Sequence, residues 1–207
     1  MRRFLRLALL AAPLVAAGCA NPAPLLVRRS ACPAVGVLEY AGDVTTFSPA
    51  ASRDASAIDM TATITNLRSN CYEQGGRIVT DATYTVLATR TRSTGPRTVT
   101  LPVFSAVVRA GDRLLSKDVS GVTLTFADGQ MRAETTASIR SDIAESAASL
   151  PDAVNREIDR RRKPGDPDAA LDPLARPEVR DAVREATFEV LVGFNLEEGQ
   201  LAYNVAK

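Results

Sequence analysis

The fold is decided by the stretch IDMTATIT at residues 58–65. Apolar side chains occupy the even positions from Ile58 to Ile64, and Asp59 and three threonines occupy the odd positions. Successive side chains of a strand point to opposite faces, so this alternation is typical of a half-buried antiparallel strand. It predicts a sheet with one face in the core and with Asp59 on the face in water.

A second alternating run covers residues 77–89. The side chains that share its apolar face are Ile78, Ala82, Tyr84 and Val86. Gln74-Gly75-Gly76 precedes this run and has the composition of a turn, so the two runs predict a β-hairpin.

Further strands are expected at similar spacing. They cover residues 36–40, 99–108, 113–126, 131–139 and 188–194. The run at 99–108 is apolar on both faces, as in a strand covered on both sides, and Asp128-Gly129 predicts a hairpin turn. About seven or eight strands without a strand–helix rhythm predict an all-β fold, an antiparallel β-sandwich of immunoglobulin or fibronectin type III architecture. A closed barrel is the alternative, and the absence of tryptophan limits the immunoglobulin comparison to architecture.

The segment at residues 142–186 lacks aromatic side chains and contains five prolines. Pro177 suits the first turn of a helix. The apolar face of that helix would hold Val179, Ala182, Val183 and Ala186. The basic run RRRK at 160–163 suggests contact with lipid phosphates, but acidic residues flank it and favour a solvated loop. We predict a partly helical or flexible insertion before the last strand.

The chain begins MRRFLRLALLAAPLVAAGCA. Its apolar stretch is shorter than the roughly 20 residues that span a bilayer, and arginines precede it, as in a secretory signal peptide. Val15-Ala16-Ala17-Gly18-Cys19 resembles the bacterial lipobox. The resemblance implies that residues 1–18 are a signal peptide, that cleavage follows Gly18 and that Cys19 is lipidated. The alternative is an ordinary signal peptide with an incidental cysteine.

Ala20 stands where retention at the inner membrane uses Asp, which implies the periplasmic face of the outer membrane; the inner membrane is the alternative. Residues 19–31 contain Pro22 and Pro24 and predict a tether, and residues 32–207 predict a single domain. Removal of residues 1–18 takes away three of the 25 basic residues and none of the 24 acidic ones, which leaves 22 against 24. Such a balance does not favour nucleic acid. We expect the membrane and another envelope protein as partners.

Cys32 and Cys71 are the remaining cysteines. In an oxidising compartment a lone pair predicts a disulfide, which would contribute roughly 4 kcal/mol by closing a loop of about 40 residues. A thiol site or a metal site is the alternative, but a metal site normally adds histidine, and the chain has none.

The lack of histidine also excludes Ser-His-Asp and Cys-His nucleophiles. Gly75-Gly76 lacks the later glycine and lysine of a phosphate loop, and the acidic residues are dispersed rather than paired as in a glycosidase. We therefore predict no catalytic residue, no cofactor and no metal site, and a protein that is not an enzyme.

Cys32-Pro33, the run LPVFSAVV at 101–108 and the ending VGFNL…QLAYN accompany the lipobox. Together they resemble an uncharacterised family of alphaproteobacterial lipoproteins, a resemblance that implies no activity. We expect the ending to close the sandwich as a clasp, with a docking motif as the alternative. The apolar residues that would fold back are Leu196, Leu201 and Tyr203.

The predicted function is a non-enzymatic interaction or envelope-assembly module, because sheet edges and end loops are natural docking surfaces. The alternative is a glycan- or lipid-binding module. A glycan site would require Tyr40, Tyr72 and Tyr84 to converge on one cleft.

Replacement of Cys19 by Ser should release the protein from the membrane, because each buried CH₂ of the missing acyl chains contributes about 0.8 kcal/mol. The measurement is the partition of the protein between the membrane and soluble fractions of the envelope. Cys71→Ser leaves the anchor in place and should stay with the membrane. A Cys19→Ser protein that remains membrane-bound would show that the lipobox interpretation is wrong.

Overall fold

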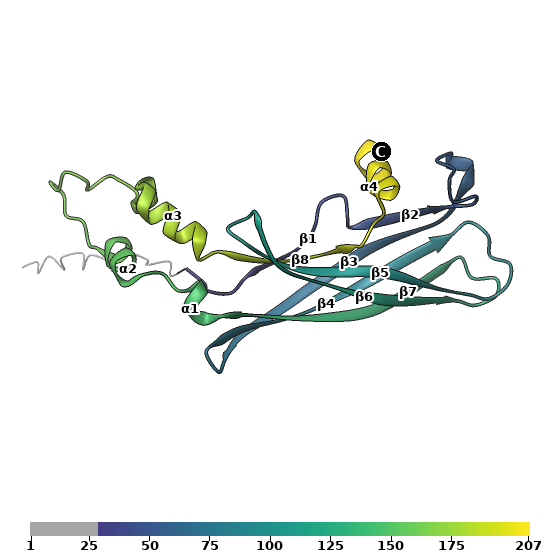
Figure 1. Ribbon diagram of the computed structural model, residues 1–207, viewed down its shortest axis with the longest axis horizontal. Helices are drawn as coiled ribbons and strands as arrows, with labels where there is room; N and C mark the ends of the chain where they lie inside the picture. The colour runs from purple at the N-terminus through teal and green to yellow at the C-terminus, as the bar shows by residue number, and fades with distance from the viewer. Residues whose placement is uncertain (1–28) are drawn as a thin grey trace, which may run out of the picture.

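The computed structural model describes residues 29–207 (Figure 1). The predicted signal peptide at 1–18, the lipidation site Cys19 and most of the tether at 19–31 lie outside the described residues. Two four-stranded sheets have the orders β1-β8-β5-β6 and β2-β3-β4-β7. The strands are β1 (Ala34–Val37), β2 (Asp43–Phe47), β3 (Ile58–Gln74), β4 (Arg77–Arg90), β5 (Arg97–Arg109), β6 (Arg113–Phe126), β7 (Arg132–Ala144) and β8 (Phe188–Phe194).

The two sheets pack face to face, which confirms the all-β sandwich. All strand pairs are antiparallel except β1 and β8, which run parallel. Strands β2, β3 and β4 follow one another in a single sheet, whereas the constant-type immunoglobulin order places no three consecutive strands side by side. The likeness to immunoglobulin domains is therefore one of architecture, and the connectivity differs from that of the constant type.

The core lies between the sheets and consists of the apolar faces that the alternation predicts. Met60 and Val86 are fully buried, and Tyr84 is 1% exposed. They pack against residues of the opposite sheet, among them Leu124 and Val192. Strand β3 is longer than expected, because it continues through a bulge after Thr65 and stays paired with β4 as far as Gln74.

The predicted insertion is partly helical and follows β7, which ends at Ala144. Its helices are α1 (Glu145–Ala148), α2 (Asp152–Asp159), a 3₁₀ turn (Pro173–Ala175) and α3 (Pro177–Glu185). Pro177 occupies the first turn of α3 as expected, and Val179 is buried. These helices extend beyond one end of the sandwich (Figure 1).

The basic run at 160–163 is held inside the insertion by acidic side chains. Arg162 pairs with Glu157 at 2.7 Å, and Arg176 pairs with Asp168 at 2.7 Å. Arg160 contacts both acids. Much of the positive charge is therefore neutralised locally, in line with the expected solvated loop.

A disulfide joins Cys32 to Cys71 and confirms the predicted pair, with the two Cα atoms 6.0 Å apart. It lies beside a second apolar cluster that includes Ile78 and Phe188. The last residues of the predicted tether lie against the body, because Arg29 donates hydrogen bonds to the carbonyl oxygens of Ala148, at 3.0 Å, and Ala186.

Two local predictions are wrong, and one strand was not predicted. Asp128-Gly129 does not close a hairpin, because β6 and β7 belong to different sheets and the turn carries the chain across the sandwich. Strand β2 was not expected. The first strand covers Ala34–Val37 rather than 36–40 and ends before Tyr40, whose φ of 61° does not fit a strand.

The ending forms a helix, α4 (Glu198–Ala206), capped by Glu197 and Gln200. It acts as a clasp in part: Tyr203 packs edge-on against Phe47, with ring centroids 5.1 Å apart. The Asn204 amide donates to the carbonyl oxygens of Tyr40 and Asp43 at 2.8 and 2.7 Å. Leu201 does not fold back, and it is 44% exposed.

The prediction for Asp59 is also wrong. The alternation of residues 58–65 placed its side chain on the face in water, but Asp59 is buried. The guanidinium of Arg97 makes a forked contact with its carboxylate, at 3.0 and 2.7 Å. This pair joins β3 of one sheet to β5 of the other. The hydrogen bond from Arg97 lowers the pKa of Asp59 below its ordinary value.

Arg90, the last residue of β4, is 2% exposed and lies over the ring of Phe126. Its guanidinium donates to four main-chain carbonyl oxygens at 2.6–3.0 Å. The acceptors are Ser93, Gly95, Ala127 and Gln130. They belong to the two connections, 91–96 and 127–131, that cross between the sheets at this end, so one side chain fixes both crossings.

Arg90→Met should lower the free energy of unfolding by roughly 3 kcal/mol or more, because it removes four hydrogen bonds that a buried guanidinium donates to the main chain. Urea denaturation with the disulfide intact measures the change. The control Arg92→Met alters a side chain that is 73% exposed and should cost about 0.5 kcal/mol or less. Equal effects of the two substitutions would contradict the role given to Arg90.

Stability should fall in acid in part through Asp59. Its pKa is lower in the folded chain than the ordinary 3.8, so the ionised form stabilises the fold above that value, and the contribution disappears as pH falls through the folded pKa. Asp59→Asn should therefore be less stable than the natural protein at pH 7, and the difference should shrink near pH 3. Urea midpoints at both pH values test this, and a constant difference would contradict it.

Candidate functional site

The first half of β6 leaves the core. Val122, Leu124 and Phe126 point inward and are buried, but the earlier positions of the same parity are Ser116, Asp118 and Ser120. With no apolar side chain at these three positions, this part of the strand does not enter the core, and residues 113–121 are exposed at every position.

The sandwich has four edge strands: β1 and β6 in one sheet, β2 and β7 in the other. Strands β1 and β2 have four and five residues, and short edges offer little for another chain to pair with. The exposed side chains of β7 are all polar. They are Arg132, Glu134, Thr136, Ser138, Arg140 and Asp142. Only β6 combines length with apolar side chains.

Leu114, Leu115 and Val119 are 59%, 55% and 53% exposed. Leu115 lies at a β-bulge, because Val107 and Val108 pair with Ser116 and Leu114 and leave it without a partner residue. In residues 29–207, β5 is the only strand that pairs with β6, so its other edge presents unpaired backbone groups. We call residues 113–121 the open edge.

Charged side chains surround the open edge. Arg113 pairs with Glu185 at the end of α3, and its hydrogen bond lowers the pKa of that carboxyl. The Lys117 ammonium donates to Asn195 Oδ1 at 2.8 Å and lies 4.8 Å from the Phe104 ring centre. The edge is thus fixed to the sheet at its start and its middle.

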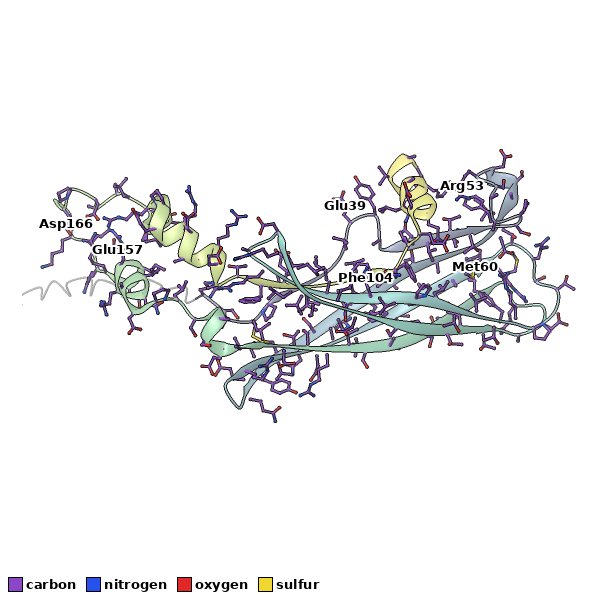
Figure 2. All side chains as sticks on the ribbon, in the orientation of Figure 1. Glu39, Arg53, Met60, Phe104, Glu157 and Asp166 are labelled. Carbon is purple, nitrogen blue, oxygen red and sulfur yellow. A yellow bond between two sulfur atoms is a disulfide. The ribbon has the colours of Figure 1, made fainter. Side chains whose placement is uncertain are left out.

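A groove of about 450 Å³ runs over the outer face of β8, β5 and β6. Its floor includes Phe104, Ala106 and Leu191, and Leu201 of α4 and Leu114 of β6 line its sides. Figure 2 places Phe104 on the sheet below α4 and Glu39 in the loop beside that helix. We call this space the outer groove.

Gly193 keeps the floor of the outer groove tightly packed. A Cβ atom at this position would lie 2.8 Å from both Ala41 Cβ and Phe104 Cε1, closer than side chains approach in folded proteins. The missing side chain therefore lets the Phe104 ring rest directly on β8.

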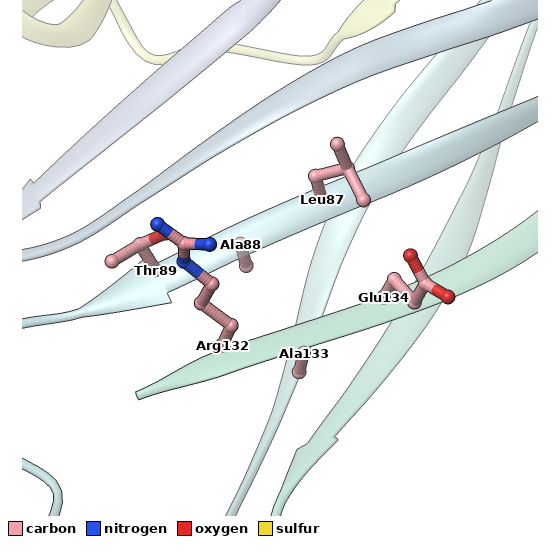
Figure 3. A pocket seen from close by; sticks show the side chains of 6 residues that line it. All are labelled: Leu87, Ala88, Thr89, Arg132, Ala133 and Glu134. Atoms are coloured by element: carbon pink, nitrogen blue, oxygen red, sulfur yellow. The ribbon is translucent and has the colours of Figure 1, made fainter. Parts of the chain in front are cut away.

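Another hollow, of about 480 Å³, lies where β4 pairs with β7 (Figure 3). Its lining residues are the cross-strand neighbours Leu87, Ala88, Thr89, Arg132, Ala133 and Glu134. All six come from two adjacent strands of one sheet, so no second element closes over a ligand there. The outer groove differs from this hollow because several elements line it, among them α4, β5, β6 and β8.

The predicted site residues separate in the structure. Cys32 and Cys71 form the disulfide, and Cys19 lies outside the described residues. The three tyrosines do not converge: Tyr84 is in the core, Tyr72 donates to Asp81 at 3.1 Å, and Tyr40 lies in the loop after β1. The sequence signal for the outer groove was the second apolar face of residues 99–108, which we interpreted as a face covered by the fold and whose Phe104, Ala106 and Val108 line the groove instead.

Comparison with known proteins finds no matching family model, no matching curated protein and no matching solved structure. Among residues 29–207, no helix is both long and apolar enough to cross a membrane. In the same part of the chain, no group of three or more His, Cys, Asp or Glu side chains is placed to hold a metal ion. Inference about function therefore starts from the open edge and the outer groove.

Proposed function

We propose that this chain is a lipid-anchored, non-enzymatic envelope protein that binds an extended segment of another envelope protein along the open edge. The observation that carries the proposal is the exposure of Leu114, Leu115 and Val119 on an edge strand with one neighbour. In this mode of binding, strand addition, an extended peptide pairs with the exposed edge of a sheet. Hydrogen bonds to the unpaired main-chain groups give affinity, and contacts with alternate side chains of the peptide give specificity.

The partner segment should alternate apolar and polar residues. Its apolar side chains would cover Leu115 and Val119, which are more than half exposed. An acidic residue opposite Lys117 and a basic residue opposite Asp118 would set the register, since like charges directly opposite each other destabilise a strand pair. These two charges also protect the isolated edge against indiscriminate pairing.

The anchor would place this edge near the bilayer. Residues 19–28 can span at most about 35 Å when fully extended, and Arg29 lies against the insertion. A lipid on Cys19 would therefore keep the insertion end of the sandwich close to the membrane, at the periplasmic face of the outer membrane under the sorting rule.

The glycan alternative loses its main support, because Tyr84 is buried and the other two tyrosines lie apart. A lipid-binding role does not depend on those tyrosines.

Photocrosslinking in intact cells tests the proposal, with p-benzoylphenylalanine in place of Leu115 of the full-length protein. We expect a discrete adduct with one envelope protein, whose crosslinked peptide is an extended, alternating segment. Adding Val119→Lys should reduce the adduct about tenfold, since an apolar side chain contributes roughly 1.5 kcal/mol when buried.

The matched control carries the same photoreactive residue at Leu87, an exposed apolar position of the central strand β4 in the other sheet. It should not give that adduct. Absence of an adduct at position 115, or an equal adduct at position 87, would overturn strand addition at β6.

A further inference from the structure

We propose that the outer groove binds the acyl chain of a free fatty acid, with the carboxylate at Lys117. This activity differs from strand addition, because the ligand would contact side chains on the outer face of the sheet, Leu114 and Lys117 of the open edge among them, rather than pair with the backbone of β6. Three observations support the proposal. The lining of the groove is mostly apolar, the backbone of its floor is already hydrogen-bonded within the sheet, and Lys117 supplies a basic side chain at the rim.

The floor and sides of the outer groove are aliphatic or aromatic over most of their length. The apolar lining residues are Leu38, Ala41, Phe104, Ala106, Val108, Leu114, Leu191, Phe194, Leu196 and Leu201. A volume of about 450 Å³ is in the range of small-molecule sites, which run from roughly 300 to 1,000 Å³. Burial of methylene groups is the interaction that such walls can provide.

The backbone of the floor is not available to a ligand. Strands β8 and β5 are both internal to their sheet and pair with neighbours on each side, so their main-chain groups are already hydrogen-bonded. A peptide could not add a strand here, and a sugar would find few partners for its hydroxyl groups. A hydrocarbon chain needs none.

One basic side chain at the rim can meet an anionic head group. Among residues 29–207, Lys117 is the only basic residue that lines the outer groove, and its hydrogen bond goes to the neutral amide of Asn195. Asp112 is neutralised by Arg184 at 2.6 Å, whereas Glu39 is a second acid on the rim. A carboxylate at Lys117 would complete an ion pair beside the apolar lining of the outer groove.

The experiment uses native membrane vesicles that contain the full-length protein and a diazirine derivative of dodecanoic acid. After illumination, we expect labelled peptides that contain Phe104, Leu114 or Leu201. Unlabelled dodecanoate should compete with the label, and dodecanol should compete about fivefold less well, because it lacks the charge that Lys117 would meet.

Two substitutions with matched controls locate the site. Leu201→Asp should reduce labelling about tenfold, and Val205→Asp should not, because Val205 lies on the same helix and is exposed but does not line the outer groove. Lys117→Met should remove the advantage of dodecanoate over dodecanol, whereas Lys163→Met in the insertion should leave it unchanged.

Labelling spread evenly over the chain, or labelling that Leu201→Asp leaves intact, would overturn the proposed site. Equal competition by acid and alcohol with the natural protein would overturn the role of Lys117. If Leu201→Asp instead abolished a protein crosslink and left fatty-acid labelling unchanged, the outer groove would be a protein-docking surface and the proposal would fail.

Discussion

The sandwich depends on one buried guanidinium. Strands β4 and β6 end at the same end of the sandwich. After each of them the chain crosses to the opposite sheet. Arg90 binds the carbonyl oxygens of both crossings and packs over Phe126, so the relative position of the sheets is fixed where the backbone would otherwise be least constrained. The forked contact between Arg97 and Asp59 adds a second link between the sheets at this end.

The other end is organised differently, and the candidate sites follow from that difference. At that end the disulfide and a smaller apolar cluster close the core. The first half of β6 is not buried there, because its inward-facing side chains are polar. The same strand is thus core at Phe126 and surface at Leu115. Helix α4 adds the outer groove by covering only part of the opposite face of the sheet.

Much of the sandwich could be predicted from the sequence, because β3 and β4 bury one face each and so display a clear period of two. Asp59 was misplaced since alternation reports only local pattern, and the side chain that covers it, Arg97, is distant in the sequence. Asp128-Gly129 has the same composition in a hairpin and in a crossing between sheets. The open edge was beyond prediction, because no local pattern tells which strand lacks a neighbour. The outer groove was partly visible in the two apolar faces of residues 99–108, although full cover was expected there.

The disulfide also determines how the protein carries mechanical load. Cys32 precedes β1, a four-residue strand paired with β8, and its covalent partner Cys71 belongs to the long β3–β4 hairpin. Tension applied to the chain ahead of residue 29 therefore passes through sulfur into the most extensively paired strands of the sandwich. Strand β1 is shielded from that tension and cannot be peeled from its neighbour residue by residue.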